Sequence, residues 1–205
     1  MSWIKIGIII IGALYVLILP YAVYKTIVRL GFDIRKYTLS YLSNSSLYDK
    51  KTVEGYTFLL LATAVLHYAF FWLLIRYYDL GEHRQILTWL DYSALFLTLL
   101  ACIHHNMLPL SFKTLRKTLL RIGHNIFAVV VFLALPTLII VFQSLIIDTH
   151  PVLGIVGFVI IGLTVLLTIA SVVREKAING IVEIIFILGI SLWTIFITLA
   201  TFFGG

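Results

Sequence analysis

Histidines and one glutamate are the residues whose types suit chemistry at one end of this chain. His104, His105 and His124 lie at the ends of two apolar segments, and Glu183 lies near the start of the last one. Imidazole and carboxylate groups bind zinc or non-haem iron, and they also act as general base and partner in catalysis. The spacing lacks the His-x3-His pair that fixes two ligands on one helix, so we expect no metal site. We also expect no other cofactor, and we assign a catalytic role to none of these residues. His67, near mid-membrane, is expected to hydrogen-bond a neighbouring helix.

Carboxylates inside apolar segments suggest a second chemistry, proton-coupled transport. Asp91 lies in the third apolar segment and Glu183 in the sixth, and helical periodicity places each of them on a face with other polar side chains. Because polar groups are costly in lipid, we expect both faces to point into the interior of a bundle. The faces comprise Asp91, Thr98, Cys102 and His105 in the third segment, and Glu183, Ser191, Thr194, Thr198 and Thr201 in the sixth.

A polar turn between the first two apolar segments offers hydroxyl and amide groups for binding. Ser43 and Asn44 begin the run Ser-Asn-Ser-Ser, whose side chains compete for backbone hydrogen bonds and so end a helix. Two interpretations stay open. The run forms either a re-entrant turn that presents Ser43 and Asn44 to a ligand, or a turn that caps the following helix, which is the more common arrangement.

Ser111–His124 carries basic and apolar side chains on opposite sides at helical spacing. This pattern predicts a basic amphipathic segment. Such a segment either lies in the headgroup layer with its cations on lipid phosphates or simply continues into the fourth apolar segment, and the second arrangement is the more common. The candidate headgroup contacts are Lys113, Arg116, Lys117 and Arg121.

The composition decides which elements can position these residues. Hydrophobic residues make up 61% of the 205 residues and charged residues 12%, whereas soluble domains have about 25% charged residues. So few charges could not cover the surface of a soluble domain, so we predict an integral membrane protein. One cysteine excludes a disulfide framework. The net charge of +6 indicates anionic lipid headgroups, and not nucleic acid, as the partner.

We predict an all-α fold in a single domain, residues 1–205: a polytopic bundle of six transmembrane helices with short outer loops. Twelve of the fifteen lysines and arginines lie on the face where the first, third and fifth spans end, which also holds both long loops, and Lys5, Arg76 and Arg84 lie on the opposite face. By the positive-inside rule, we expect a multi-pass protein of the cell membrane with cytoplasmic long loops and both termini outside. The predicted spans are residues 4–24, 56–77, 86–103, 123–147, 152–173 and 180–203.

Several short motifs resemble those of a known membrane family. LSYLSNSS precedes the second span, HHNMLPLSFK follows the third, IGHNIFAVVVFLALPTL opens the fourth, and INGIVEIIFILGISLW begins the sixth. Together they resemble the six-span family called domain of unknown function 998, which is itself similar to the Frag/DRAM group. The resemblance implies a six-helix membrane fold and no particular reaction. The residues that match the family's pattern are Ser40 or Ser43, Pro109, His124, Glu183 and Trp193.

We therefore expect a protein that binds lipid or a small amphiphile in the cytoplasmic half of the bundle. Three alternatives stay open: an intramembrane enzyme acting on lipid headgroups through His105 or His124 with Glu183, a small proton-coupled transporter, and a subunit of a larger membrane assembly. Membrane lipids with anionic headgroups are the expected partners, and a homo- or hetero-oligomer stays open. The candidate ligand-binding residues are Ser43, Asn44, His105, His124 and Glu183.

Overall fold

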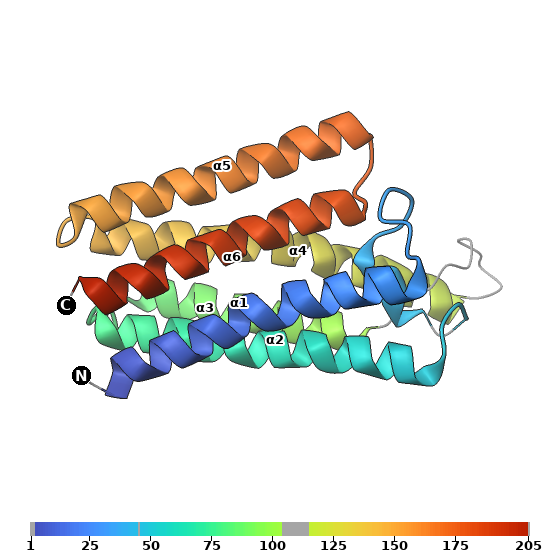
Figure 1. Ribbon diagram of the computed structural model, residues 1–205, viewed down its shortest axis with the longest axis horizontal. Helices are drawn as coiled ribbons and strands as arrows, with labels where there is room; N and C mark the ends of the chain where they lie inside the picture. The colour runs from blue at the N-terminus through green and yellow to red at the C-terminus, as the bar shows by residue number, and fades with distance from the viewer. Residues whose placement is uncertain (1–2, 45, 104–114, 205) are drawn as a thin grey trace.

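All the regular secondary structure in the described part of the chain is helical. The computed structural model describes residues 3–44, 46–103 and 115–204, without the side chains of Arg116 and Lys117. Within these ranges lie six α-helices and a short 3-10 helix, η1 (Figure 1). The six α-helices are long and apolar enough to cross a membrane, which confirms the predicted fold class. The elements are α1 (Trp3–Leu30), η1 (Leu39–Ser43), α2 (Lys50–Tyr77), α3 (Arg84–Cys102), α4 (Leu115–Ile146), α5 (Pro151–Glu175) and α6 (Gly180–Phe203).

The helices lie side by side along one long axis (Figure 1). α1 packs against α2 and α6, α3 packs against α2 and α4, and α5 packs against α4 and α6. Both chain termini lie at the same end of the bundle, and the connection from α1 to α2 lies at the other (Figure 1). We call this other end the basic end, since the last turns of α1 and α5 and the first turns of α2 and α4 carry lysines and arginines there.

Three helices extend further into the basic end than the apolar pattern predicts. α1 continues past residue 24 to Leu30, α2 begins at Lys50 and not near residue 56, and α4 begins at Leu115 and not near residue 123. Lysine, arginine and glutamate are good helix formers, so a helix continues after its sequence has ceased to be apolar. The apolar pattern therefore marks the span and not the whole helix.

The start of α2 is capped by a residue that the sequence analysis did not single out. Asp49 is its N-cap and accepts a hydrogen bond from the backbone N–H of Thr52 at 3.1 Å. Of the two interpretations of the Ser-Asn-Ser-Ser run, the one in which it caps the following helix is therefore wrong. Asn44 instead follows the last residue of η1, as its C-cap.

The described part of the basic segment, residues 115–124, is the beginning of α4. One helix runs from Leu115 to Ile146, with Pro136 inside it. Of the two interpretations of Ser111–His124, the structure therefore supports continuation into the fourth span for these residues.

The predicted polar face of α3 points the wrong way. Asp91, Thr98 and Cys102 are exposed on the outside of the bundle. Side chains at three- and four-residue spacing on the other side of the helix make the contact with α2 and α4. The buried residues of α3 are Ile86, Leu90, Ser93, Leu97 and Ala101.

The polar face of α6 does point inward. Thr194, Thr198 and Thr201 are buried, which confirms the expectation for these three residues. The Thr194 hydroxyl donates to the Ile190 carbonyl at 2.9 Å, and the hydroxyls of Thr201 and Tyr78 form a hydrogen bond of 2.8 Å. The interior of the bundle beside the C-terminal half of α6 is thus partly polar.

Small residues allow α5 to pack closely on both of its neighbours. A Cβ atom on Gly154 would lie 2.8 Å from the Cα of Ile147, and one on Gly157 would collide with the side chain of Gln143 on α4. On the other side, Thr164 lies directly against Gly189 of α6. Because lipid tails are as apolar as the helices, such close packing holds membrane helices together where hydrophobic burial does not.

Aromatic side chains fill the middle of the bundle. The rings of Phe71 and Trp193 stack at 5.5 Å with an interplanar angle of 9°, and Phe142 meets Trp193 edge-on at 5.9 Å. In the amide orientation that satisfies its hydrogen bonds, Gln143 accepts from the indole N–H of Trp193 at 2.7 Å and donates to the Leu153 carbonyl at 3.3 Å. The buried indole and amide are therefore paired, which an apolar interior requires.

Candidate functional site

A pocket of about 890 Å³ lies between α1 and α2, on the half of these helices nearer the basic end. Its walls are mainly apolar and include Ile18, Leu59, Ala62 and Leu66, together with Leu42 from η1. Along α2 the lining residues span 51–66, about 22 Å at a rise of 1.5 Å per residue. Ligand pockets in proteins measure roughly 300–1,000 Å³. The pocket is therefore of ligand size and extends from the helix ends deep into the span.

Cationic side chains gather at the mouth of this pocket. Lys25 and Arg29 of α1 and Lys51 of α2 line it. Within the ranges that the structure covers, none of these three cations takes part in a salt bridge. The Lys25 ammonium lies 5.1 Å from the centroid of the Tyr21 ring, which also lines the pocket. Their charges are therefore available to an anion.

One carboxylate, Asp49, accompanies these cations. Its pKa is held below the usual range, first by hydrogen bonds from Thr52 and then by the nearby charges of Arg29 and Lys51. Asp49 is thus ionised at neutral pH and stabilises the N-terminus of α2, where a negative charge is favourable. The mouth keeps a net charge of +2, from three cations and one anion.

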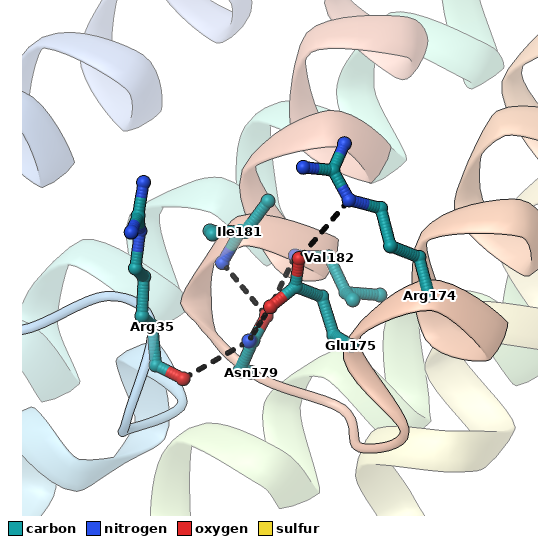
Figure 2. Close-up of polar contacts among 6 residues, drawn as sticks. All are labelled: Arg35, Arg174, Glu175, Asn179, Ile181 and Val182. Atoms are coloured by element: carbon teal, nitrogen blue, oxygen red, sulfur yellow. Dashed lines mark hydrogen bonds and ion pairs between the residues drawn. The ribbon is translucent and has the colours of Figure 1, made fainter.

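Asn179 ties the connection between α1 and η1 to the start of α6 (Figure 2). Its Oδ1 accepts hydrogen bonds from the N–H groups of Ile181 and Val182, at 3.1 and 3.2 Å, and so caps α6. Its Nδ2 donates to the Arg35 carbonyl at 3.0 Å and to the Glu175 carboxylate at 3.2 Å. One side chain therefore caps a helix and holds a segment that lies 144 positions earlier in the chain.

Glu183 completes this attachment. Its carboxylate accepts a hydrogen bond from the backbone N–H of Leu39, the first residue of η1. We call the contacts of Asn179, Gly180, Ile181 and Glu183 with residues 34–39 the clasp. The two remaining hydrogen bonds of the clasp run from Gly180 N to Tyr37 O at 2.9 Å and from Ile181 N to Ile34 O at 3.2 Å.

The clasp positions one wall of the pocket. Leu39 and Leu42 of η1 belong to a buried apolar cluster with Val23 and Phe32, against which Ile184 of α6 packs. Leu42 also lines the pocket. Glu183 was predicted to bind a ligand. The structure shows its carboxylate bound to the backbone of η1, whose Leu42 lines the pocket, and its role in ligand binding stays a prediction.

Ser43 and Asn44, the other predicted binding residues of this region, are buried and bonded locally. The Ser43 hydroxyl donates to the Ser40 carbonyl at 2.7 Å. The Asn44 Oδ1 accepts from the N–H and the hydroxyl of Ser46, at 2.9 and 2.6 Å. These bonds shape the turn that leads from η1 to α2.

His124 joins α4 to α3. It is buried, and its Nδ1 forms a hydrogen bond of 2.6 Å with the carbonyl of Ile103, the C-cap residue of α3. Arg121, one turn earlier, is partly buried. The other candidates lie outside the described residues, and their roles stay predictions: His105, Lys113, and the side chains of Arg116 and Lys117.

The predicted histidine cluster is only partly described, because His104 also lies outside the described ranges. Among the histidine, cysteine and acidic side chains inside those ranges, no group of three could hold a metal ion.

A buried polar cluster links α1, α2 and α3 at mid-bundle. His67 Nε2 forms a hydrogen bond of 2.8 Å with the Ser93 hydroxyl, and its Nδ1 lies 3.4 Å from the Tyr15 hydroxyl. This confirms that His67 bonds to neighbouring helices. A serine beside a histidine has the geometry of a nucleophile and its base. Ser93 is 0% and His67 1% exposed, so the pair lies inside the bundle and connects three helices.

Some functional residues of the structure had no sequence prediction. These are the polar contacts of the core, Tyr15, Ser93 and Gln143, and the group of cations Lys25, Arg29 and Lys51. Ser93 lies off the polar face that periodicity indicates in the third segment, and Gln143 lies beside Ser144 in the apolar fourth segment. No periodic pattern there distinguishes an inward side chain from an outward one. The only available signal was that each is costly in lipid and therefore needs a partner.

Comparison with known proteins identifies one family. A family model with the description "protein of unknown function (DUF998)" matches residues 9–200 of the chain, a range that reaches from α1 into α6. No curated protein and no solved structure matches the chain. The similarity to the Frag/DRAM group stays a prediction.

Proposed function

The chain belongs to the DUF998 family of proteins of unknown function, and we propose that it binds an anionic membrane lipid in the pocket between α1 and α2. The observation that supports this function is the combination, in one pocket, of a long apolar interior and a cationic mouth. A phospholipid with an anionic headgroup has the same division into an apolar chain and a charged end. Anionic headgroups attract lysine and arginine at the membrane surface.

Each part of the pocket suits one part of such a lipid. Arg29 offers a planar guanidinium that binds phosphate oxygens in pairs, and Lys25 and Lys51 add compact positive charges. The acyl chain lies between α1 and α2, along Ala62 and Leu66. The depth of the pocket, about 22 Å along α2, accommodates a chain that enters the membrane from the headgroup layer.

The proposal places the basic end at the cytoplasmic face of the membrane. Lysine and arginine concentrate on the cytoplasmic side of multi-pass proteins, and anionic lipids are enriched in the cytoplasmic leaflet. A reporter fused after Gly205 is therefore expected to be active only outside the cytoplasm. Activity only inside would reverse this orientation and separate the pocket from that leaflet.

Native mass spectrometry of the purified protein titrated with phosphatidylglycerol or phosphatidylcholine tests the function. The triple variant Lys25→Gln/Arg29→Gln/Lys51→Gln is expected to lose its preference for phosphatidylglycerol by at least about tenfold, since each cation near the headgroups contributes about 1 kcal/mol. The matched control is Lys36→Gln/Arg174→Gln/Lys176→Gln, which removes three cations of the same end that do not line the pocket.

The control variant is expected to keep the preference of the unmodified protein. An equal loss in both triple variants would indicate general attraction to a basic surface, and the pocket would then have no specific role. An unchanged preference in the pocket variant would contradict the proposed function directly.

A further inference from the structure

The outer face of α3 carries a row of side chains that the α1–α2 pocket does not explain. Its members follow one another at alternating spacings of four and three residues, the spacing by which one helix packs along another. Apart from the partly buried Thr88, they are exposed. We call this row the α3 outer stripe: Arg84, Thr88, Asp91, Leu95, Thr98 and Cys102.

Asp91 lies well inside the span. It follows Arg84, the first residue of α3, by seven residues, about 10 Å along the helix. The neighbouring helix gives a second measure of this depth. Ser93, two residues after Asp91, bonds to His67 of α2. His67 precedes Tyr77, the last residue of α2, by ten residues, which is about 15 Å along the helix. Since half of the hydrocarbon layer is about 15 Å thick, Asp91 faces outward at a depth where lipid tails surround the protein.

The carboxylate of Asp91 has no partner within the described part of the chain, where it forms neither a salt bridge nor a side-chain hydrogen bond. A carboxylate in lipid is costly, and intramembrane acids pair with other groups. The position therefore calls for a partner outside this chain.

A second copy of this chain does not supply that partner. The lysines and arginines near the end where α3 begins are Lys5 in the first turn of α1, Arg76 in the last turn of α2 and Arg84, so none lies at the depth of Asp91. A two-fold pair about the membrane normal would bring equal depths together, and Asp91 would face a second Asp91. Like charges at such a contact repel each other.

We propose that the α3 outer stripe is the docking surface for a transmembrane helix of a different protein, one that carries a lysine or arginine at the depth of Asp91. The charge pair forms in the membrane, where an intramembrane acid and a cation compensate each other. Thr88 precedes Asp91 along the stripe and Thr98 lies two positions after it, beyond Leu95, and the small threonine side chains allow the partner helix to approach closely.

The test uses the full-length protein in nanodiscs with a synthetic polyleucine transmembrane helix that carries one lysine at the depth of Asp91. A single cysteine in this peptide lies at the depth of Cys102, the one cysteine of the protein, which is exposed. With an added oxidant, we expect a disulfide between peptide and protein. Its yield is expected to drop to background when the peptide lysine is replaced by leucine, or when the protein carries Asp91→Leu.

Two controls make the result decisive. Glu82→Gln, which removes an acid in the α2–α3 connection, is expected to leave the yield unchanged. Asp91→Leu is expected to keep the thermal midpoint of the isolated protein, since Asp91 supports no contact within the described fold. Equal crosslinking by the leucine peptide, dimers linked through Cys102 in place of the peptide adduct, or a lowered midpoint in Asp91→Leu would each overturn the proposal.

Discussion

Asn179 and Glu183 show how two side chains place a segment that is distant in sequence. The sequence indicated Glu183 as notable because it is an acid at the start of an apolar helix, and it suggested a ligand. In the structure its carboxylate holds the backbone of Leu39, and Asn179 holds the carbonyl of Arg35. The type of residue was predictable, but its partner was not, because a backbone N–H leaves no mark in the sequence.

Removal of the clasp side chains is expected to loosen η1. Glu183→Ala leaves the Leu39 N–H without its acceptor, and Asn179→Ala removes a helix cap worth about 1 kcal/mol. In hydrogen–deuterium exchange, the amides of Leu39, Gly180 and Ile181 are expected to exchange faster in both variants. The affinity of both variants for phosphatidylglycerol is expected to fall as well, because Leu42 of η1 lines the pocket.

Glu183→Gln serves as the conservative comparison, since its amide oxygen still accepts a hydrogen bond. The Leu39 amide is expected to exchange more slowly in Glu183→Gln than in Glu183→Ala. Unchanged protection of Leu39 in Glu183→Ala would show that η1 does not depend on the clasp.

At the scale of the helices, the sequence predicted the six spans well and the direction of their faces poorly. Apolar runs of about 20 residues suffice to identify a span. The orientation of a face is harder, because lipid tails and the bundle interior are both apolar. The threonines of α6 point inward as predicted, whereas Asp91 and Thr98 of α3 point outward. The shapes of the packed side chains decide between these outcomes, and a hydropathy pattern does not contain them.

Close packing at α5 provides a prediction about stability. Gly157→Val places a side chain against Gln143 and is expected to disturb the hydrogen bond between Gln143 and Trp193. Overpacking of this kind costs about 1–3 kcal/mol, so the thermal midpoint in detergent is expected to fall.

The control on the same helix is Gly162→Val. No heavy atom lies within 4 Å of a Cβ at Gly162, so its midpoint is expected to stay close to that of the unmodified protein. If the two variants behaved alike, the close contact between α4 and α5 would have no energetic importance.

For the whole molecule, the sequence predicted the basic end but not the pocket. Lys25, Arg29 and Lys51 counted among the many cations that flank the spans, and their common position depends on how α1 approaches α2. One wall of the pocket, Leu42, belongs to η1, which hydrogen bonds from α6 hold in place. Charge asymmetry can be read from a sequence, whereas a pocket between helices requires their arrangement.

The most direct test of lipid binding is photochemical mapping in nanodiscs with phosphatidylglycerol that carries a photoreactive group in its acyl chain. The account predicts adducts on residues 18–30 and 51–66, which excess phosphatidylglycerol removes and excess phosphatidylcholine does not. Ala62→Phe, which narrows the pocket, is expected to reduce the same adducts. Uniform adducts over the exposed faces of α3 and α5, unaffected by either competitor, would contradict the account.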